Sequence, residues 1–427
     1  MFLKKSRLFG FRDSLIFVSM LALTSMLTLP AWAATAPDTQ LNLLYGGTAD
    51  DYARSVVQTS DNGYVLVGTT VSFGVNTDAW MVRVDSSGNK QWDKNFGGGG
   101  YENAFAVIKT NDGGYALAAE TTSYGAGGFD FWLVKIDSSG TLEWNRTYGG
   151  TGSDEAYCIV QTSDGGYALA GTTTSYGSGG YDFWLVKTDS SGNRQWDKAF
   201  GGTGDDQAYS IVQMNDGGDA IVGTTNSFGS GKEDFWLVKT DSLGNIQWNK
   251  TYGGPESDSA KSIVKSNDGG LAIAGVSNSD TWLVKTDSSG GMQWNNTYGG
   301  TSAGYDEANS IVQAADGGYA VAGSWGGHQE GWLVKTDILG NMEWSKHYQG
   351  TSAGFPEETN CVIQNTDEGY ALAGSIGSSG ASREMWLVTI ASAPVIPEFP
   401  QTAVCLVLVT SLFAAVTLKK RQRNNLN

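Results

Sequence analysis

Acidic residues recur at two fixed points of a sequence unit that repeats about every fifty residues. Carboxylates gathered on one face of a protein would suit Ca²⁺, a hard cation that takes several oxygen ligands at once. The alternative interpretation is that these acids accept hydrogen bonds from loop amides, as Asp often does in turns. The metal candidates are the paired acids of three copies: Asp154, Glu155, Asp205, Asp206, Asp306 and Glu307.

A second group of residues could contact an organic ligand. The loop TSYGSGGYD of one copy is replaced by VSNSD at 276–280 and by SWGGHQE at 324–330, while the segments TSAGYDE and TSAGFPE gain residues. A binding groove is expected where an otherwise regular array becomes irregular. Aromatic rings there could stack on a sugar, although such rings more commonly fill the gap between neighbouring repeats. The ligand candidates are Tyr305, Trp325, His328 and Phe355.

The sequence contains none of the common catalytic motifs. Two histidines, His328 and His347, are too few for a typical zinc site, and no HExxH, GxSxG or P-loop motif occurs. Glu357 and Glu358 are adjacent, and adjacent residues of a strand point to opposite faces. A carboxylate pair for glycoside hydrolysis would therefore have to come from different repeats. We expect a protein that is not an enzyme.

Three Asn-X-Thr sequons stand at the same position of three copies. They begin at Asn145, Asn249 and Asn295, each directly after a tryptophan. Glycans there would coat the outer edge of the molecule. Sequons also arise by chance in repeats that are rich in Asn and Thr.

The repeat itself consists of four short apolar runs separated by turn residues. In the copy from Asp154 to Gly202 these runs cover 156–162, 166–173, 182–189 and 194–201. The Asp-Gly between the first and second runs fits a tight hairpin, because those residues accept positive φ. No sustained helical period occurs within the repeats. Each copy is therefore predicted to be a four-stranded antiparallel meander.

Side-chain size rises across this meander, from Ala and Gly in the second run to Phe, Trp and Tyr in the third and fourth. A wedge-shaped sheet packed between two like sheets needs this gradient, which is typical of a β-propeller blade. The third run carries its tryptophan in seven copies, but the fourth run does so in only six, since the last copy ends near Ile390. The segment Gln40 to Tyr45, with Leu41 in the tryptophan position, supplies the missing strand. We predict an all-β, seven-bladed propeller over residues 39–390, closed by its N-terminal strand.

The strand order gives the ring two different faces. The loop-rich face carries the connections between blades and those between second and third strands, and most of the acids and candidate ligand-binding residues lie there. The hairpin face carries the tight turns between first and second and between third and fourth strands.

Two features resemble known propeller families. Asp189, Gly192 and Trp196 resemble the tryptophan-docking motif of quinoprotein propellers, and the third strand leading to that tryptophan is similar to Kelch repeats. The resemblance covers the chain from Gln40 to Ile390 and implies a propeller fold. The sequence differs from quinoprotein enzymes because it has seven units and no vicinal cysteine pair. No cofactor-binding residue of those enzymes can therefore be assigned to a position in this chain.

The two ends of the chain have the composition of export and anchoring signals. Residues 1–33 combine basic residues, an apolar run and Ala-Trp-Ala, as in a cleaved signal peptide. Residues 402–418 carry no charge and precede a basic tail at 419–427, as in a transmembrane anchor whose tail stays in the cytoplasm. The linker at 391–401 contains Pro397-Glu398-Phe399, which resembles the PEF-type sorting signals of archaeal surface proteins.

The net charge of the chain limits the classes of partner that it can bind. The chain of 427 residues has a formal net charge of −17, and both ends are basic. A strongly acidic surface repels phosphates, so nucleic acid is excluded as a partner. We expect a propeller anchored at the cell surface, with its loop-rich face binding an extracellular protein or glycan and Ca²⁺ as the one cofactor the residues suggest. The alternative is a secreted carbohydrate-active or quinoprotein-like enzyme that uses the same face.

Overall fold

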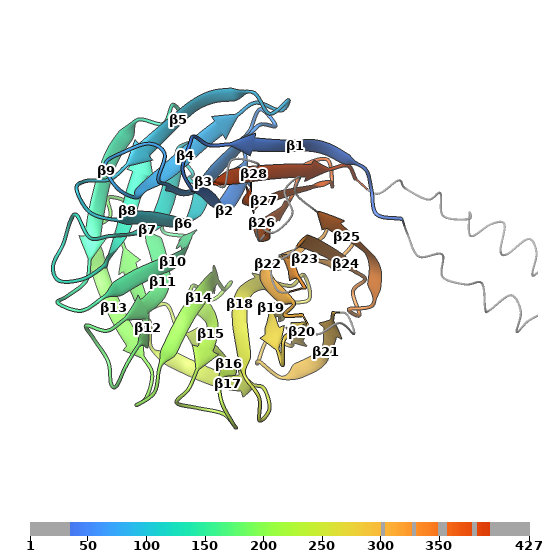
Figure 1. Ribbon diagram of the computed structural model, residues 1–427. Helices are drawn as coiled ribbons and strands as arrows, with labels where there is room; N and C mark the ends of the chain where they lie inside the picture. The colour runs from blue at the N-terminus through green and yellow to red at the C-terminus, as the bar shows by residue number, and fades with distance from the viewer. Residues whose placement is uncertain (1–34, 300–303, 327–329, 349–356, 378–381, 393–427) are drawn as a thin grey trace, which may run out of the picture. The chain divides into compact units, whose positions relative to one another are not determined.

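The computed structural model of the protein describes residues 35–299, 304–326, 330–348, 357–377 and 382–392. Over these ranges the chain forms 28 strands in seven four-stranded antiparallel sheets. The sheets stand around a ring, with the first strand of each nearest the centre and the fourth at the rim (Figure 1). The chain is therefore an all-β, seven-bladed propeller, which confirms the fold predicted from the repeats.

The strands follow one another blade by blade along the chain. Blades 1 to 3 contain β2 (Asp51–Gln58), β3 (Tyr64–Thr70), β4 (Asp78–Val84), β5 (Lys90–Phe96), β6 (Glu102–Lys109), β7 (Tyr115–Thr121), β8 (Asp130–Ile136), β9 (Leu142–Tyr148), β10 (Asp154–Gln161), β11 (Tyr167–Thr173), β12 (Asp182–Thr188) and β13 (Arg194–Phe200). Blades 4 to 6 contain β14 (Asp206–Gln213), β15 (Asp219–Thr225), β16 (Asp234–Thr240), β17 (Ile246–Tyr252), β18 (Asp258–Lys265), β19 (Leu271–Ser277), β20 (Asp280–Thr286), β21 (Met292–Tyr298), β22 (Glu307–Gln313), β23 (Tyr319–Trp325), β24 (Glu330–Thr336) and β25 (Met342–Tyr348). Blade 7 contains β26 (Glu358–Gln364), β27 (Tyr370–Gly377), β28 (Arg383–Ile390) and β1 (Thr39–Tyr45).

Neighbouring blades share their cores. The third strand β12 is buried at every residue, because blades cover it on both sides. Phe131 of blade 2 and Trp184 of blade 3 illustrate the contact between blades, with ring centroids 4.6 Å apart. A Cβ atom on Gly171 in β11 would lie 2.0 Å from the carbonyl oxygen of Glu155, so that position of the second strand holds no side chain. The predicted gradient of side-chain size therefore matches the wedge shape of each blade.

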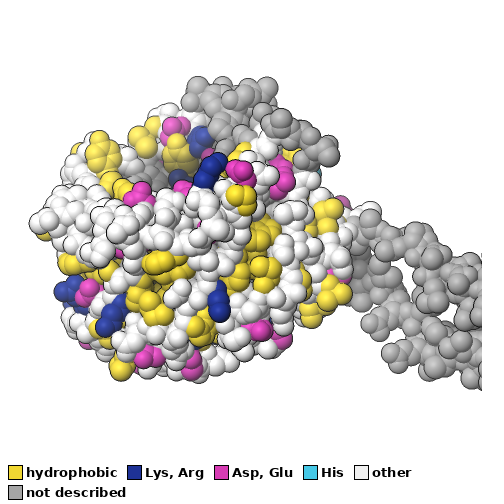
Figure 2. All heavy atoms as spheres, turned by 90° about the horizontal axis from the view of Figure 1, so that it is seen from below, with side chains coloured by type: hydrophobic (Ala, Val, Ile, Leu, Met, Phe, Trp, Pro, Cys, Tyr) yellow, Lys and Arg dark blue, Asp and Glu magenta, His cyan; other side chains and the backbone are white. Residues whose placement is uncertain are grey.

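The rim is more exposed than the core strands. Figure 2 shows one side of the ring, where hydrophobic side chains lie among polar ones. Leu142, Ile246 and Met292 each begin a fourth strand and are 45%, 44% and 46% exposed. The fourth strands thus cover the blades inside them while presenting some apolar surface to solvent.

The N-terminal strand closes the ring as predicted. β1 pairs antiparallel with β28 and completes blade 7, and Leu41 lies opposite Thr389, the register that a tryptophan holds in other blades. The indole N–H of Trp386 donates a hydrogen bond of 2.7 Å to Asn42. The Tyr45 hydroxyl donates one of 2.8 Å to the carbonyl of Gly88 in blade 1. The last blade is thereby joined to the first.

Tight turns connect blades at the rim. Gly192 has a φ of 76°, and a Cβ there would lie 2.6 Å from the ring of Trp144 in the preceding blade. The Tyr148 hydroxyl donates a hydrogen bond of 2.6 Å to the carbonyl of Gly192. Asp189 holds this turn by accepting bonds from the amides of Ser191 and Asn193 at 2.9 and 2.8 Å. The motif that resembles tryptophan docking therefore joins neighbouring blades in this protein.

In blades 2 to 6, a buried lysine ties a turn of the hairpin face to its blade. Lys187 is 7% exposed, and its Nζ lies 2.8 Å from a carboxylate oxygen of Asp164 in the Asp-Gly turn. Burial alone would raise the pKa of Asp164, but hydrogen bonds from Lys187 and Thr162 outweigh burial and hold that pKa at about 2. The same pair recurs as Lys135–Asp112, Lys239–Asp216, Lys285–Asp268 and Lys335–Asp316.

The compact unit that contains the ring ends at Ala391. The predicted signal peptide at 1–33, the PEF motif, the anchor at 402–418 and the tail at 419–427 lie outside the described residues. In the part of the chain that the structure describes, no helix is long and apolar enough to cross a membrane.

Deleting residues 39–45 should open blade 7, because β28 would then expose its backbone N–H and C=O groups as an unpaired edge. We expect loss of cooperative unfolding and aggregation at micromolar concentration, measured by calorimetry and light scattering. The matched control is a circular permutant that places residues 39–45 after Ile390 through a Ser-Ser-Gly-Asn turn. A permutant as unstable as the deletion would contradict the role assigned to β1.

Candidate functional site

The acid that opens each blade is buried and bonded to the loop around it. Asp154 is 0% exposed. Its Oδ2 accepts hydrogen bonds from the amide of Gly150 at 2.8 Å and from the Ser175 hydroxyl at 2.7 Å, and its Oδ1 accepts one from the Thr173 hydroxyl. Each carboxylate thus joins the entry into its blade to the end of the second strand. Acids with the same kind of bonds are Asp51, Glu102 and Asp206.

At the entries of blades 2 to 6, an acid from the preceding blade lies beside the acid that opens the blade, and all of these second acids except Asp280 are buried. A Cβ on Gly149 would lie 1.9 Å from Oδ1 of Asp130 and 2.8 Å from Oδ2 of Asp154, so the glycine sits between carboxylates of blades 2 and 3. Burial, with a smaller contribution from the charge of Asp154, raises the pKa of Asp130 to about 6, although the hydrogen bond from the amide of Ala126 lowers it. The corresponding acids with raised pKa values are Asp182, Asp234 and Asp280.

The six metal candidates therefore divide into two groups. Asp154, Asp206 and Asp306 are buried at blade entries, where Asp306 accepts a bond of 2.7 Å from the amide of Gly326. The other three have separate surroundings: Glu155 accepts a bond from the Tyr157 hydroxyl, Asp205 accepts one of 3.0 Å from the amide of Tyr181, and Glu307 lies at the start of β22. Over the described ranges, no three His, Cys, Asp or Glu side chains gather as metal ligands would. Calcium binding stays a prediction.

The shortened loop of blade 5 leaves a hollow on the loop-rich face. Asn278 and Ser279 connect β19 to β20 directly, with φ values of 48° and 73° that fit a two-residue hairpin turn. Blades 2 to 4 have eight-residue loops at this place, such as 174–181 in blade 3. We name the resulting hollow, of about 250 Å³, the blade-5 notch. It is lined by residues that include Lys232, Glu233, Glu256, Asn278, Ser279 and Tyr305.

The blade-5 notch combines charge with one aromatic ring. Lys232 and Glu256 form an ion pair of 3.1 Å across its border. Tyr305 is 39% exposed. Burial of its inner part, with the charges of Glu307 and Glu233, raises the Tyr305 pKa to about 12, so the hydroxyl stays protonated and can donate a hydrogen bond. The notch therefore offers a ring face, a phenol and excess negative charge.

A second acidic feature lies on the inner strands of blades 2 and 3. Glu120 of β7 is 5% exposed, and one of its oxygens accepts a hydrogen bond of 2.7 Å from Asn103, while the other is buried without a partner. Burial raises the pKa of Glu120 to about 7. The hydrogen bond from Asn103 lowers this pKa, and the charge of Glu155 raises it. The charge of Glu155, from blade 3, thus acts on a carboxyl group of blade 2.

Aromatic rings continue along the first strands beside this pair. Phe105 and Tyr157 have centroids 4.9 Å apart, and Tyr157 and Tyr209 have centroids 5.5 Å apart. Lys261 Nζ lies 4.3 Å from the centre of the Tyr209 ring, a cation–π contact. These residues share one repeat position, which carries different side chains in different blades.

The remaining ligand candidates are not brought together. Tyr305 lines the blade-5 notch, whereas Trp325 packs against Trp332 in blade 6 with centroids 4.9 Å apart and lines a different hollow. His328 and Phe355 lie outside the described residues. The loop aromatics of other blades lie over the third-strand tryptophan, as Tyr176 does over Trp184 at 5.2 Å. Each of those loop aromatics thus packs on a tryptophan of its own blade.

The sequon asparagines have a structural task. Asn145, Asn249 and Asn295 accept hydrogen bonds of 3.2, 3.4 and 3.1 Å from the third-strand tryptophans of their own blades. Blades 1 and 3 use Asp93 and Asp197 in the same way. In these five blades the repeated position thus supplies an acceptor to the tryptophan, and glycosylation of these asparagines stays a prediction.

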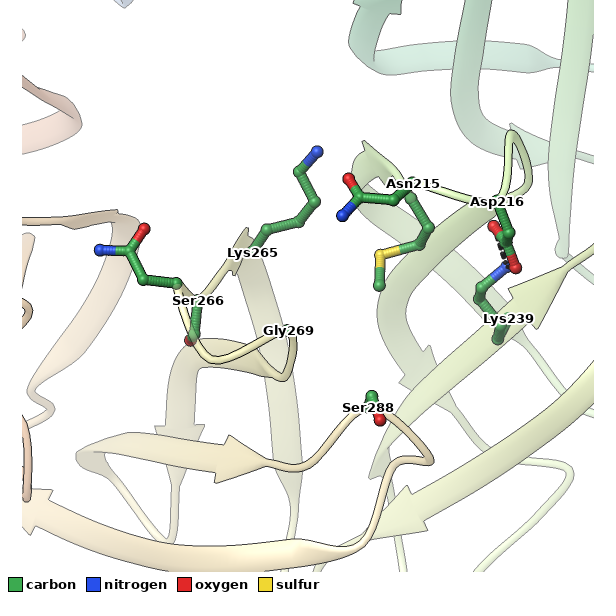
Figure 3. A pocket seen from close by; sticks show the side chains of 9 residues that line it. Asn215, Asp216, Lys239, Lys265, Ser266, Gly269 and Ser288 are labelled. Atoms are coloured by element: carbon green, nitrogen blue, oxygen red, sulfur yellow. Dashed lines mark hydrogen bonds and ion pairs between the residues drawn. The ribbon is translucent and has the colours of Figure 1, made fainter.

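Sequence reasoning missed a hollow of about 550 Å³ on the hairpin face between blades 4 and 5. Figure 3 shows Lys265 and Asn215 beside it and the ion pair of Lys239 with Asp216. In five blades this position holds a glutamine that accepts a bond from the turn of the preceding blade, whereas blades 2 and 5 have Lys109 and Lys265. Gln213, for example, accepts a bond from the amide of Ser163 at 2.9 Å. An alignment of the seven copies would have shown Lys265 at a position where most copies have glutamine.

No protein-family model matches the chain. It is 28% identical over 249 residues to the regulatory protein FlaEY of Caulobacter vibrioides, a match that covers 54% of this chain and 24% of that protein. The chain thus spans about a quarter of the length of this curated relative.

Several solved structures resemble the chain at low identity. The complex of Drosophila Plexin A with Semaphorin 1b gives a TM-score of 0.47 at 9% identity and covers 84% of this chain and 88% of that chain. Drosophila Semaphorin 1b, domains 1–2, gives 0.46 at 10% identity, with coverage of 84% and 88%. A protein of unknown function from Dyadobacter fermentans gives 0.46 at 10% identity, with coverage of 84% and 99%. Likenesses this distant identify no function.

The buried acids should make the protein more stable at pH 5 than at pH 8. A group whose pKa is raised by folding contributes stability below its unfolded pKa near 4, and this contribution is lost as pH rises through the folded pKa. For Asp130 the folded pKa is about 6 and for Glu120 it is about 7, so the melting temperature should fall between pH 5 and 8. Calorimetry at fixed high ionic strength measures this.

Asp130→Asn should remove part of that slope, about 1 kcal/mol in the free energy of unfolding between the two pH values. The matched control is Asp137→Asn, because hydrogen bonds from Ser139 and the amide of Thr141 lower the pKa of this exposed group and it does not titrate in that range. A melting temperature that rises from pH 5 to 8 in the wild type would contradict the pKa assignments.

Proposed function

We propose that this chain is a binding module that is exported, anchored at the cell surface, and without catalytic activity. Its loop-rich face engages an extracellular protein or glycan. Export and anchoring are supported by the composition of residues 1–33 and 402–418. We further propose that Pro397-Glu398-Phe399 belongs to an archaeal type of sorting signal, and that the blades are akin to quinoprotein and Kelch repeats.

The blade-5 notch is the observation that carries this proposal. Blades 2 to 4 fill the same place with an eight-residue loop, whereas blade 5 leaves a hollow with Tyr305 at its border. A concave site with an aromatic ring and a few polar groups is typical of ligand recognition. The excess of carboxylates favours a neutral or basic ligand over an anionic one.

Tyr305→Ala should weaken ligand binding at least tenfold, because a central aromatic anchor commonly contributes this much or more. The matched control is Tyr101→Ala: Tyr101 also directly precedes the first acid of its blade and is 55% exposed, but it lies away from the notch. Binding of the purified, labelled full chain to arrays of glycans and of extracellular matrix proteins gives the affinities.

A second variant tests the notch by filling it while Tyr305 is kept. Replacing Asn278 and Ser279 with the eight-residue loop 226–233 of blade 4 should fill the hollow and abolish binding while the melting temperature is kept. Equal losses for Tyr305→Ala and Tyr101→Ala, or full binding by the filled variant, would show that the notch is not the site.

A second candidate function rests on Glu120. A buried carboxyl group with a pKa of about 7 beside a second carboxylate is the arrangement that a general acid needs in glycoside hydrolysis. Glu120 and Glu155 come from β7 and β10, so they belong to different blades as this chemistry requires. A secreted carbohydrate-active enzyme is therefore the competing proposal.

Hydrolysis of soluble polysaccharides by the purified full chain tests this competing proposal. Turnover should fall as pH rises through about 7, because the acid form of Glu120 is then lost. Glu120→Gln should lower it at least a hundredfold, while Glu143→Gln at the rim leaves it unchanged. If no polysaccharide of a broad set is hydrolysed at pH 5, the proposal of a carbohydrate-active enzyme is rejected and the proposal of a binding module is kept.

A further inference from the structure

Blade 6 departs from the repeat at three positions, and the three side chains meet. Trp325 stands where blades 1 to 4 have threonine, Ser345 stands where the other blades have asparagine or aspartate, and His347 stands where three blades have threonine. All three line one hollow of about 400 Å³ at the rim, between the outer strands of blades 5 and 6. Independent exceptions that converge on one place indicate a site.

Aromatic rings form one wall of this rim pocket. The rings of Trp325 and Trp332 have centroids 4.9 Å apart, and Trp325 contacts His347 edge to face at 4.9 Å. Trp325 is half-buried and the His347 side chain is 35% exposed, so both have surface left for a ligand. Asn296 and Asn341 border the same hollow and add amide groups. The volume lies within the range of small-molecule sites, about 300–1,000 Å³.

The rim pocket also contains an unmet hydrogen-bond donor. In six blades the indole N–H of the third-strand tryptophan donates to an Asn or Asp on the fourth strand. In blade 6 this place is taken by Ser345, and the indole nitrogen of Trp332 is buried with no partner. Serine is too short to replace the asparagine, so the space in front of the indole N–H adjoins the pocket. An unpaired buried donor is costly, and an oxygen atom from a ligand would satisfy it.

We propose that the rim pocket binds a neutral pyranose sugar. One face of a pyranose carries C–H groups and can stack on Trp325. Its hydroxyl groups can accept from the Trp332 indole and donate to the side-chain amide oxygens of Asn296 and Asn341, whose NH2 groups already bond to Gly340 and Asp337. The pocket combines an apolar wall with several uncharged polar groups, which matches that chemistry. A sugar hydroxyl takes the place that the asparagine side chain fills elsewhere, with a small rotation of the rings in front of it.

A quaternary ammonium ion is the competing ligand for an aromatic wall. The carboxylate of Glu330 lies 3.1 Å from His347 Nδ1 and would favour a cation. An indole N–H is a donor, however, and a quaternary ammonium ion cannot accept its hydrogen bond. The unmet donor therefore favours the sugar.

This proposal does not depend on the proposed function of the blade-5 notch. The rim pocket and the notch share no lining residue. Tyr305→Ala should therefore leave binding at the rim pocket unchanged. Failure of one proposal can be told apart from failure of the other, because each site has its own variants.

The test uses the purified full chain and four probes: methyl β-D-glucopyranoside, methyl β-D-galactopyranoside, methyl α-D-mannopyranoside and N-acetyl-D-glucosamine. Titration calorimetry and tryptophan fluorescence should show saturable binding of at least one sugar in the millimolar range. Ser345→Asn should weaken that binding at least tenfold and raise the melting temperature, because it gives the Trp332 indole its acceptor and fills the pocket. Trp325→Ala should weaken binding at least tenfold by removing the stacking wall.

The matched control is Asn249→Ser in blade 4, which makes the same exchange in reverse at the equivalent position. It should lower the melting temperature and leave sugar affinity unchanged. The proposal is overturned if no sugar saturates at up to about 100 mM, if Ser345→Asn binds as well as the wild type, or if choline chloride saturates the site while the sugars do not.

Discussion

Each blade of this ring is covered on both faces by blades built from the same repeat, and that constraint governs the molecule. A third strand such as β12 is buried at every residue only because blades 2 and 4 stand on its two sides. A single blade could not bury its tryptophans, and an open row would leave two apolar faces in water. The chain meets this constraint by pairing β1 with β28, so that blade 7 is as complete as the others.

Polar groups that repeat with the blades fix how they fit together. Buried acids such as Asp154 accept several hydrogen bonds at each blade entry, Lys187 and Asp164 tie the opposite turns, and Tyr148 reaches the next blade. Because Asp154, Lys187 and Tyr148 are buried, each would be costly without its hydrogen-bond partners in place. The repeats therefore define not only a hydrophobic core but also one relative orientation of neighbouring blades.

The seven-bladed architecture could be predicted from the sequence alone. A single short apolar run does not identify a strand, but seven copies of the same pattern do. The sequence even identified Leu41 as the residue in the tryptophan position of the closing strand. It did not show that Asp154 is buried while Asp205 is exposed, since that depends on which way each side chain turns at a loop. The pairing of Asp130 with Asp154 and the influence of Glu155 on Glu120 join different blades, and no spacing within one copy encodes them. Tyr305 and Trp325 were grouped because both stand where the repeat becomes irregular, but they line separate hollows.

The way in which the ring is closed also determines how it would respond to mechanical load. The amide of Ala391 donates a hydrogen bond of 3.0 Å to the carbonyl of Asp38, so the two segments that leave the ring do so side by side. β28, which runs into the C-terminal segment, is flanked by β27 on one side and β1 on the other. Tension applied along that segment would pull β28 lengthwise past both neighbours and load two ladders of hydrogen bonds together. A ring closed in this way resists shear, whereas a force that peels β1 sideways would open it one bond at a time.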